Sequence, residues 1–192
     1  MKEIYFDNQN DIDPTAQIGP DVTIGKGNVI GAFTVIKGTV IIGDNNYIAP
    51  FVCIGEPPEY RNRKAEGKIV IGNNNRISEF VAVQMPTLTE LTIIGNDNMI
   101  MDKCHIAHDC KIGNGVNIAP MTSLGGSVLI DCYCNLGQSV VIHPRLMVGK
   151  GAMVGMGAVV TKNIPEFETW AGVPAKYMKP NQKAIDKYET NK

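Results

Sequence analysis

Residues 104–110 read CHIAHDC and bring together side chains that can do chemistry. The segment contains His105 and His108, two of the chain's three histidines, together with Asp109 and two of its five cysteines. Imidazole and thiolate groups bind zinc, paired thiols form disulfides, and an imidazole beside a carboxylate acts as a general base. Which of these chemistries applies depends on the elements that position the residues.

Composition narrows the class of protein. The chain has 192 residues, with 18 basic and 19 acidic side chains, and a formal charge of −1. This balance gives no electrostatic argument for binding nucleic acid or a membrane surface. No apolar run approaches the ~20 residues that span a bilayer, and the first residues lack the apolar stretch of a signal peptide. We therefore expect a cytoplasmic protein without membrane insertion, and the odd number of cysteines argues against a disulfide framework.

An aliphatic residue recurs at every sixth position. Isoleucine occupies all eight steps from Ile12 to Ile54, and the register resumes over 71–83 and 94–160. A period of six fits neither an α-helix nor the simple alternation of a strand. It predicts a solenoid of short strands, three per coil, with the aliphatic residues on the axis and glycines or small residues at the corners.

This pattern resembles the hexapeptide-repeat family over residues 12–165. The resemblance implies an all-β fold, a left-handed parallel β-helix of triangular section with 18 residues per coil. We assign residues 1–165 to the β-helix and 166–192 to a C-terminal extension, in which a short capping helix is predicted to start at Asn181. The register breaks at 55–70 and 84–93 predict inserted loops, which are candidate walls of a binding pocket.

The register also sorts the residues of CHIAHDC. Cys104 and Cys110 fall on small inward positions, so both thiols are expected to fill the core. His105 and His108 fall outside the inward positions and are expected to face outward or to lie at corners. The γ-class carbonic anhydrases bind zinc through three histidines on this fold, but in a different order and spacing from 105, 108 and His143. We predict no metal site, and keep a zinc hydratase and a non-catalytic scaffold as alternatives.

The run DKCHIAHDCKIGNGV resembles the region around the catalytic base of hexapeptide acyltransferases that act on UDP-N-acetylglucosamine, and its HDC triplet resembles nucleotide-sugar acetyltransferases. The resemblance implies that His108 is the general base and that the backbone N–H of Gly126, one coil later, binds the thioester carbonyl. An imidazole titrates near neutral pH and can take the proton of a sugar hydroxyl or amine. Asp109 is a candidate to orient the ring. Candidate substrate contacts are Gln84, His105 and His143.

The C-terminal run VGMGAVVTKNIPEFETWAGVPAKYMKP resembles the end of acetyl-CoA-dependent hexapeptide enzymes. The resemblance implies acetyl-CoA as co-substrate, with contacts from Gly126, Gly157, Ala158, Lys162 and Lys176. We therefore predict an acetyltransferase that acts on a hydroxyl or amine of a sugar, a nucleotide-linked amino sugar of surface polysaccharide, by direct attack.

An acyltransferase that takes its acyl group from acyl carrier protein is the alternative enzyme. Gln84 and Ser127 stand where that family has histidines, and Glu59 and Tyr60 stand near the position of a loop aspartate. The family is trimeric, so the resemblance also implies a homotrimer with active sites between subunits.

Overall fold

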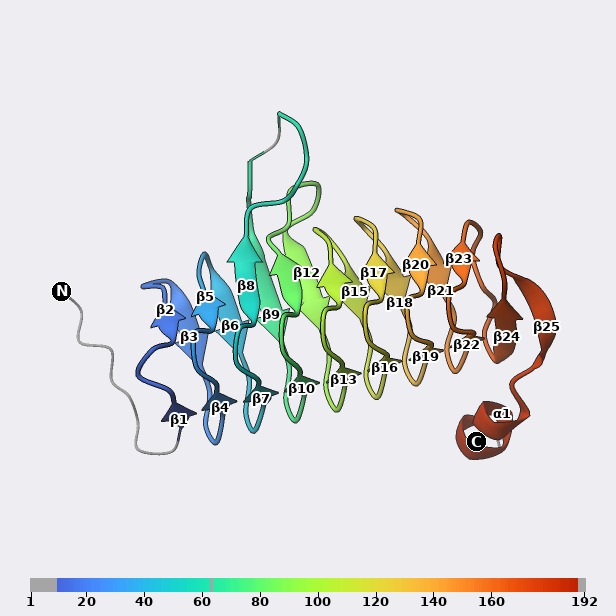
Figure 1. Ribbon diagram of the computed structural model, residues 1–192, viewed down its shortest axis with the longest axis horizontal. Helices are drawn as coiled ribbons and strands as arrows, with labels where there is room; N and C mark the ends of the chain where they lie inside the picture. The colour runs from blue at the N-terminus through green and yellow to red at the C-terminus, as the bar shows by residue number, and fades with distance from the viewer. Residues whose placement is uncertain (1–9, 63, 190–192) are drawn as a thin grey trace.

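The computed structural model describes residues 10–62 and 64–189, which form one continuous parallel β-helix (Figure 1). The strands stack in three sheets, and the chain passes to the next sheet at each corner. Successive coils pair in register, for example Ile100 with Ile118 and Ile106 with Leu124. The predicted all-β, left-handed parallel β-helix is confirmed. Residues 1–9 of the predicted β-helix lie outside the described residues.

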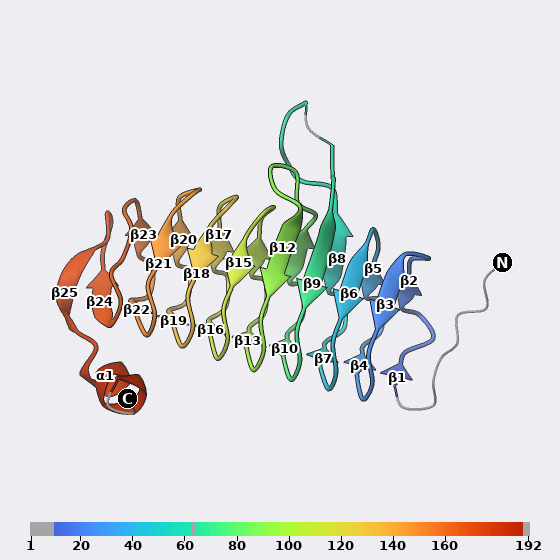
Figure 2. The ribbon, with the colours of Figure 1, turned by 180° about the vertical axis from the view of Figure 1, so that it is seen from behind.

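The three sheets run side by side along the whole prism (Figure 2). The first sheet contains β1 (Asp11–Ile12), β4 (Val29–Ile30), β7 (Tyr47–Ile48), β10 (Arg76–Ile77), β13 (Met99–Ile100), β16 (Asn117–Ile118), β19 (Asn135–Leu136), β22 (Met153–Val154), β24 (Glu168–Ala171) and β25 (Lys176–Pro180). The second contains β2 (Gln17–Ile18), β5 (Val35–Ile36), β8 (Cys53–Glu56), β11 (Ala82–Gln84), β14 (His105–Ile106), β17 (Ser123–Leu124), β20 (Val141–Ile142) and β23 (Val159–Val160). The third contains β3 (Val22–Ile24), β6 (Val40–Ile42), β9 (Lys68–Ile71), β12 (Leu91–Ile94), β15 (Lys111–Ile112), β18 (Leu129–Ile130) and β21 (Met147–Val148).

The aliphatic residues of the repeat form the core. From Ile30 to Val160 their exposed fractions are 0–2%. Ile12, Ile18 and Ile24 are only partly buried, because they belong to the first coils of the stack. Within the described residues, no helix is long and apolar enough to cross a membrane.

Both inserted segments leave the same edge of the prism, the corner between the second and third sheets (Figure 1). Strands enter both predicted insertions, so the first loop covers 57–67, between β8 and β9, and the second covers 85–90, between β11 and β12. The flanks remain strands because they still find partners on adjacent coils, as Leu91 pairs with Lys68 and Ile94 with Ile71.

The C-terminal segment closes the far end of the stack. Strand β24 pairs in parallel with β22, and β25 turns back antiparallel to β24, so the first sheet continues past residue 165. Helix α1 (Gln182–Tyr188) follows Asn181, whose Nδ2 donates to the Gly151 carbonyl at 2.8 Å. The Tyr188 ring stacks on Tyr133 with centroids 4.1 Å apart. Residues 190–192 lie outside the described part of the chain.

Candidate active site

His108 lies at the turn after β14, at the corner from which both loops leave. Its backbone N–H donates to Gln84 Oε1 at 3.3 Å. Tyr60 of the first loop meets the imidazole edge-on, with ring centroids 5.4 Å apart and an interplanar angle of 82°. The residue is 9% exposed. It is therefore covered from outside the prism rather than buried in the axial core.

The neighbouring Asp109 carboxylate is enclosed by the second loop, and its side chain is 0% exposed. It accepts hydrogen bonds from the backbone N–H groups of Thr87, Leu88 and Thr89, and from the Thr89 hydroxyl at 2.7 Å. Burial raises the pKa of Asp109, but hydrogen bonds from His108, Thr89 and Leu88 together hold that pKa below its ordinary value. The carboxylate is therefore ionised at neutral pH, with Oδ2 at 2.7 Å from His108 Nδ1.

This contact determines which tautomer of the neutral imidazole is favoured. A carboxylate beside Nδ1 favours the tautomer with the proton on Nδ1, which leaves the Nε2 lone pair available as a base. Gly126 lies against the same edge of the ring, because a Cβ at this position would fall on Cε1 and Nε2 of His108. The Gly126 N–H donates to no acceptor in the described part of the chain. A basic nitrogen and an uncommitted N–H donor are thus adjacent.

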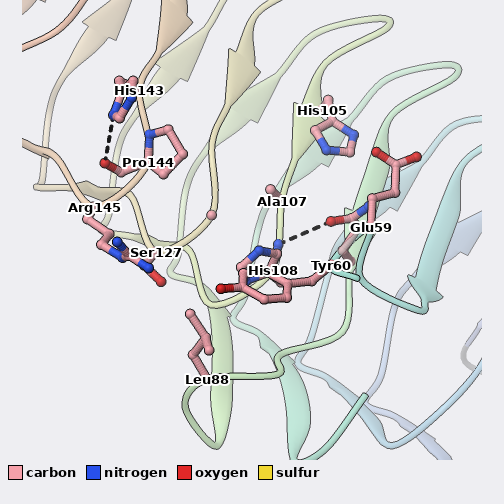
Figure 3. Close-up of a pocket in the computed structure, with 12 residues that line it drawn as sticks. Glu59, Tyr60, Leu88, His105, Ala107, His108, Ser127, His143, Pro144 and Arg145 are labelled. Carbon is pink, nitrogen blue, oxygen red and sulfur yellow. Dashed lines mark hydrogen bonds between the residues drawn. The ribbon is translucent and has the colours of Figure 1, made fainter. Parts of the chain in front are cut away.

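A cavity of about 410 Å³ opens over these two groups (Figure 3). It is lined by Glu59, Tyr60, Gln84, Leu88, His105, Ala107, His108, Gly126, Ser127, His143, Pro144 and Arg145. Both loops and three successive coils contribute to the wall.

A second hollow of about 330 Å³ adjoins the cavity along the second sheet. It shares His105, Ala107, His143 and Pro144 with the cavity. Its further lining includes the apolar residues Leu124, Val141, Ile142 and Val159. This apolar groove runs away from His108 toward the C-terminal coils.

The structure brings most of the predicted site residues together. His108, Gly126, Gln84, His105 and His143 line the cavity, and Asp109 supports His108 from behind. His143 is exposed, with Nδ1 at 3.2 Å from the Pro144 carbonyl oxygen.

Of the residues predicted to contact acetyl-CoA, Gly126 lines the cavity and the other four lie elsewhere. Gly157, Ala158, Lys162 and Lys176 do not line the cavity. Ala158 is fully buried as a corner residue of the core, whereas both lysines are exposed.

Thr89 and Arg145 contribute to the site but were not predicted from the sequence. Thr89 was missed because its backbone and hydroxyl contacts to Asp109 span 20 residues and leave no local pattern. Arg145 could have been found, because it follows Asp109 by two repeats of 18 residues at the same corner.

The cysteines of CHIAHDC belong to the core, as predicted. Cys104 and Cys110 are buried and unpaired, and burial raises the pKa of their thiols to about 11 and about 12. Among the residues that the structure describes, no group of three His, Cys, Asp or Glu side chains is placed to hold a metal ion.

Comparisons with known proteins agree with this architecture. A family model described as bacterial transferase hexapeptide (six repeats) matches residues 12–38 and 91–126. An acyl-[acyl-carrier-protein]–UDP-N-acetylglucosamine O-acyltransferase of Herminiimonas arsenicoxydans is 35% identical over 185 residues, covering 85% of this chain and 70% of the relative. The corresponding protein of Verminephrobacter eiseniae is 36% identical over 146 residues, covering 73% of this chain and 55% of the relative. The chain thus spans about half the length of the second relative.

Solved structures give the same family. The UDP-N-acetylglucosamine acyltransferase from Campylobacter jejuni superposes with a TM-score of 0.85 at 28% identity, covering 95% of this chain and 77% of that chain. The enzyme from Francisella novicida superposes with a TM-score of 0.70 at 34% identity, covering 94% of this chain and 70% of that chain.

The predicted co-substrate, acetyl-CoA, is wrong, because the named relatives take their acyl group from acyl carrier protein. The C-terminal run that suggested acetyl-CoA has a structural explanation. Its GVPAK turn reverses the chain between β24 and β25, and Ala175 in that turn packs against the core. The CoA contacts assigned to Gly157, Ala158, Lys162 and Lys176 depended on that donor and are withdrawn with it.

Proposed function

The chain belongs to the hexapeptide-repeat family that includes the acyl-[acyl-carrier-protein]–UDP-N-acetylglucosamine O-acyltransferases, and we propose that it transfers an acyl group from acyl carrier protein to a hydroxyl of a UDP-linked amino sugar. One observation supports this acyl-transfer chemistry most directly. The Nε2 edge of His108, whose Nδ1 contacts Asp109, lies against Gly126 in a cavity large enough for a sugar.

The reaction follows from these positions. His108 Nε2 takes the proton of the acceptor hydroxyl while the hydroxyl oxygen attacks the thioester carbon. The carbonyl oxygen becomes an oxyanion and accepts a hydrogen bond from the Gly126 N–H. As the C–S bond breaks, the imidazolium returns its proton to the departing thiolate. The products are a sugar ester and the free thiol of the carrier protein.

Asp109 supports both proton transfers. Its negative charge stabilises the imidazolium that forms when His108 is protonated. Hydrogen bonds from the second loop hold the carboxylate in place throughout. The fixed carboxylate therefore needs no rearrangement during the reaction, which is the electrostatic advantage of a preorganised site.

The apolar groove supports an acyl donor longer than acetyl. It begins at His105 and His143, which also line the cavity, and continues past Val141 and Val159. Burying methylene groups there contributes about 0.8 kcal/mol each, which a two-carbon acyl group does not exploit. The homotrimer with active sites between subunits remains part of the proposal, and sedimentation analysis of the purified chain tests it.

The test is an acyl-transfer assay with UDP-N-acetylglucosamine and acyl carrier proteins loaded with chains of increasing length. We expect ester formation by the wild-type chain. His108→Asn is expected to lower kcat by about 10²- to 10⁴-fold, because it removes the base, while nucleotide-sugar binding measured by calorimetry persists. Absence of turnover with every acyl carrier protein would overturn the proposal, as would unchanged kcat in the variant.

A further inference from the structure

The two sides of the cavity differ in the charge type of their side chains. Its lining includes one acidic side chain, Glu59, and one arginine, Arg145. Figure 3 shows these two residues on opposite sides of His108. Gln84 also belongs to the wall, and its Oε1 is engaged by the His108 N–H. A ligand that spans the cavity therefore meets an anionic group at one end and a cationic group at the other.

The position of Arg145 is fixed by the repeat. Asp109, Ser127 and Arg145 occupy the same corner of three successive coils, each in the left-handed region with φ of 63°, 61° and 65°. The Ser127 N–H donates to the His108 carbonyl at 2.9 Å, and the Arg145 N–H donates to the Gly126 carbonyl at 3.0 Å. Successive coils are about 4.8 Å apart. Arg145 is therefore held two rungs from the residue that supports the base.

The charge of Arg145 is not used within the described chain. Among the described residues, no ion pair or side-chain hydrogen bond involves the Arg145 guanidinium. The same holds for the Ser127 hydroxyl, and Ser127 also lines the cavity. An arginine on an open surface is solvated and needs no ligand. Arg145 is itself exposed, but it also lines the cavity that contains the His108 imidazole and Ser127.

We propose that Arg145 is a phosphate-binding residue that determines how a substrate lies across the cavity; this inference rests on the proposed function. A planar guanidinium donates two parallel hydrogen bonds to phosphate oxygens, and such charged pairs are stronger than neutral ones. Glu59 repels phosphate from the opposite end and accepts hydrogen bonds from sugar hydroxyls. Both substrates carry phosphate: the diphosphate of the nucleotide sugar and the phosphodiester of the carrier protein's pantetheine arm.

The experiment compares Arg145→Gln and Arg145→Lys with the wild-type chain, measuring KM separately for the nucleotide sugar and for acyl carrier protein. We expect Arg145→Gln to raise one of the two KM values about 10- to 100-fold, with kcat changed less than about 3-fold, since binding common to ground and transition state is lost. Arg145→Lys, which keeps the charge but not the fork, is expected to fall between. The substrate whose KM rises identifies the bound phosphate.

Lys103→Gln is the matched control. Lys103 is exposed at a different corner, outside the cavity, and its loss changes net charge equally. Equal KM values for Arg145→Gln and this control would overturn the inference while leaving the proposed function standing.

Calorimetric titration of UDP-N-acetylglucosamine and of free 4′-phosphopantetheine provides a second readout. It keeps the inference testable if the wild-type chain shows no turnover, a result that overturns the proposed function itself. Weaker binding of one ligand to Arg145→Gln supports the phosphate site, and unchanged binding of both overturns it.

Discussion

Two corners of this prism use the same repeat for different purposes. Between the third and first sheets, Asn28, Asn46, Asn75 and Asn98 occupy equivalent buried positions. Each of their side-chain oxygens accepts the backbone N–H at the equivalent position of the next coil at 2.8–3.0 Å. Between the second and third sheets, the corner position one residue earlier in the repeat, which has a positive φ, holds Asp109, Ser127 and Arg145, which differ in charge.

The difference separates a corner that only stabilises the fold from a corner that also lines the cavity. In the asparagine ladder, identical residues satisfy one another, so the corner is closed to ligands. The ladder ends at Asn98. Its Oδ1 accepts the Val116 N–H, but its Nδ2 group is buried without a partner among the described residues. At the other corner, Asp109 is satisfied by an inserted loop, and Arg145 faces the cavity.

Among the variants that test this comparison of corners, the largest effect is expected at Gly126. Gly126→Ala places a methyl group on the His108 ring and displaces it from the N–H donor. We expect kcat to fall about 10²- to 10³-fold, comparable with removal of one oxyanion donor. Gly157→Ala is the control: a Cβ there meets nothing within 4 Å, but its φ of 65° strains an alanine, so kcat is compared per folded molecule. Steady-state assays of both variants check this, and equal kcat values would contradict the role of Gly126.

Asp109→Asn is expected to lower the free energy of unfolding by about 2–3 kcal/mol at neutral pH, because hydrogen bonds to a buried charge are lost. The pKa of Asp109 in the folded chain lies below its ordinary value of 3.8. Its stabilisation is therefore complete above that value and disappears as the pH falls through the lower folded pKa. Urea unfolding at several pH values measures the difference between wild type and variant. A difference that stays constant from pH 7 to pH 3 would contradict the assignment.

A variant of the asparagine ladder is expected to lower stability without lowering activity. Asn75→Ala leaves the Asn98 N–H and the Gly95 carbonyl without their partners, so we expect stability to fall by about 2 kcal/mol. Activity per folded molecule is expected to be unchanged, because this corner does not touch the cavity. Asn135→Ala, on an exposed strand position, is the control for urea unfolding and kcat. A lower kcat in the folded Asn75→Ala variant would show that the two corners are coupled.

The smallest expected effect is at Thr89, where Thr89→Val removes one hydroxyl contact to Asp109 and keeps the backbone N–H groups. The loss of about 1 kcal/mol corresponds to roughly a 5-fold lower kcat with unchanged KM. Thr89→Ser is expected to restore kcat, since it keeps the hydroxyl. If serine and valine behave alike, the hydroxyl does not position Asp109.

For residues within the repeat, the sequence by itself determined the coil to which each belongs and whether its side chain faces the axial core. The six-residue period reflects which residues are buried along the axis, so it placed Ile106 and Cys110 in the axial core and His108 outside it. That His108 is nevertheless covered follows from the first loop, whose Tyr60 ring lies against it. The repeat of 18 residues also predicted that Gly126 lies one coil from His108, and in the structure the two residues are in contact. The donor was mispredicted from a C-terminal run that, in the structure, forms the hairpin of β24 and β25 at the end of the stack.

Only the tertiary structure decided how the site is completed. The two loops leave the same corner from adjacent coils, which the register allows but does not require, and the second loop wraps its N–H groups around Asp109. These contacts join residues 20–22 positions apart through backbone atoms. A periodic core can be predicted from the sequence because it needs particular side chains at particular positions. A loop that donates backbone N–H groups to Asp109 cannot, because every residue type except proline supplies the same donor.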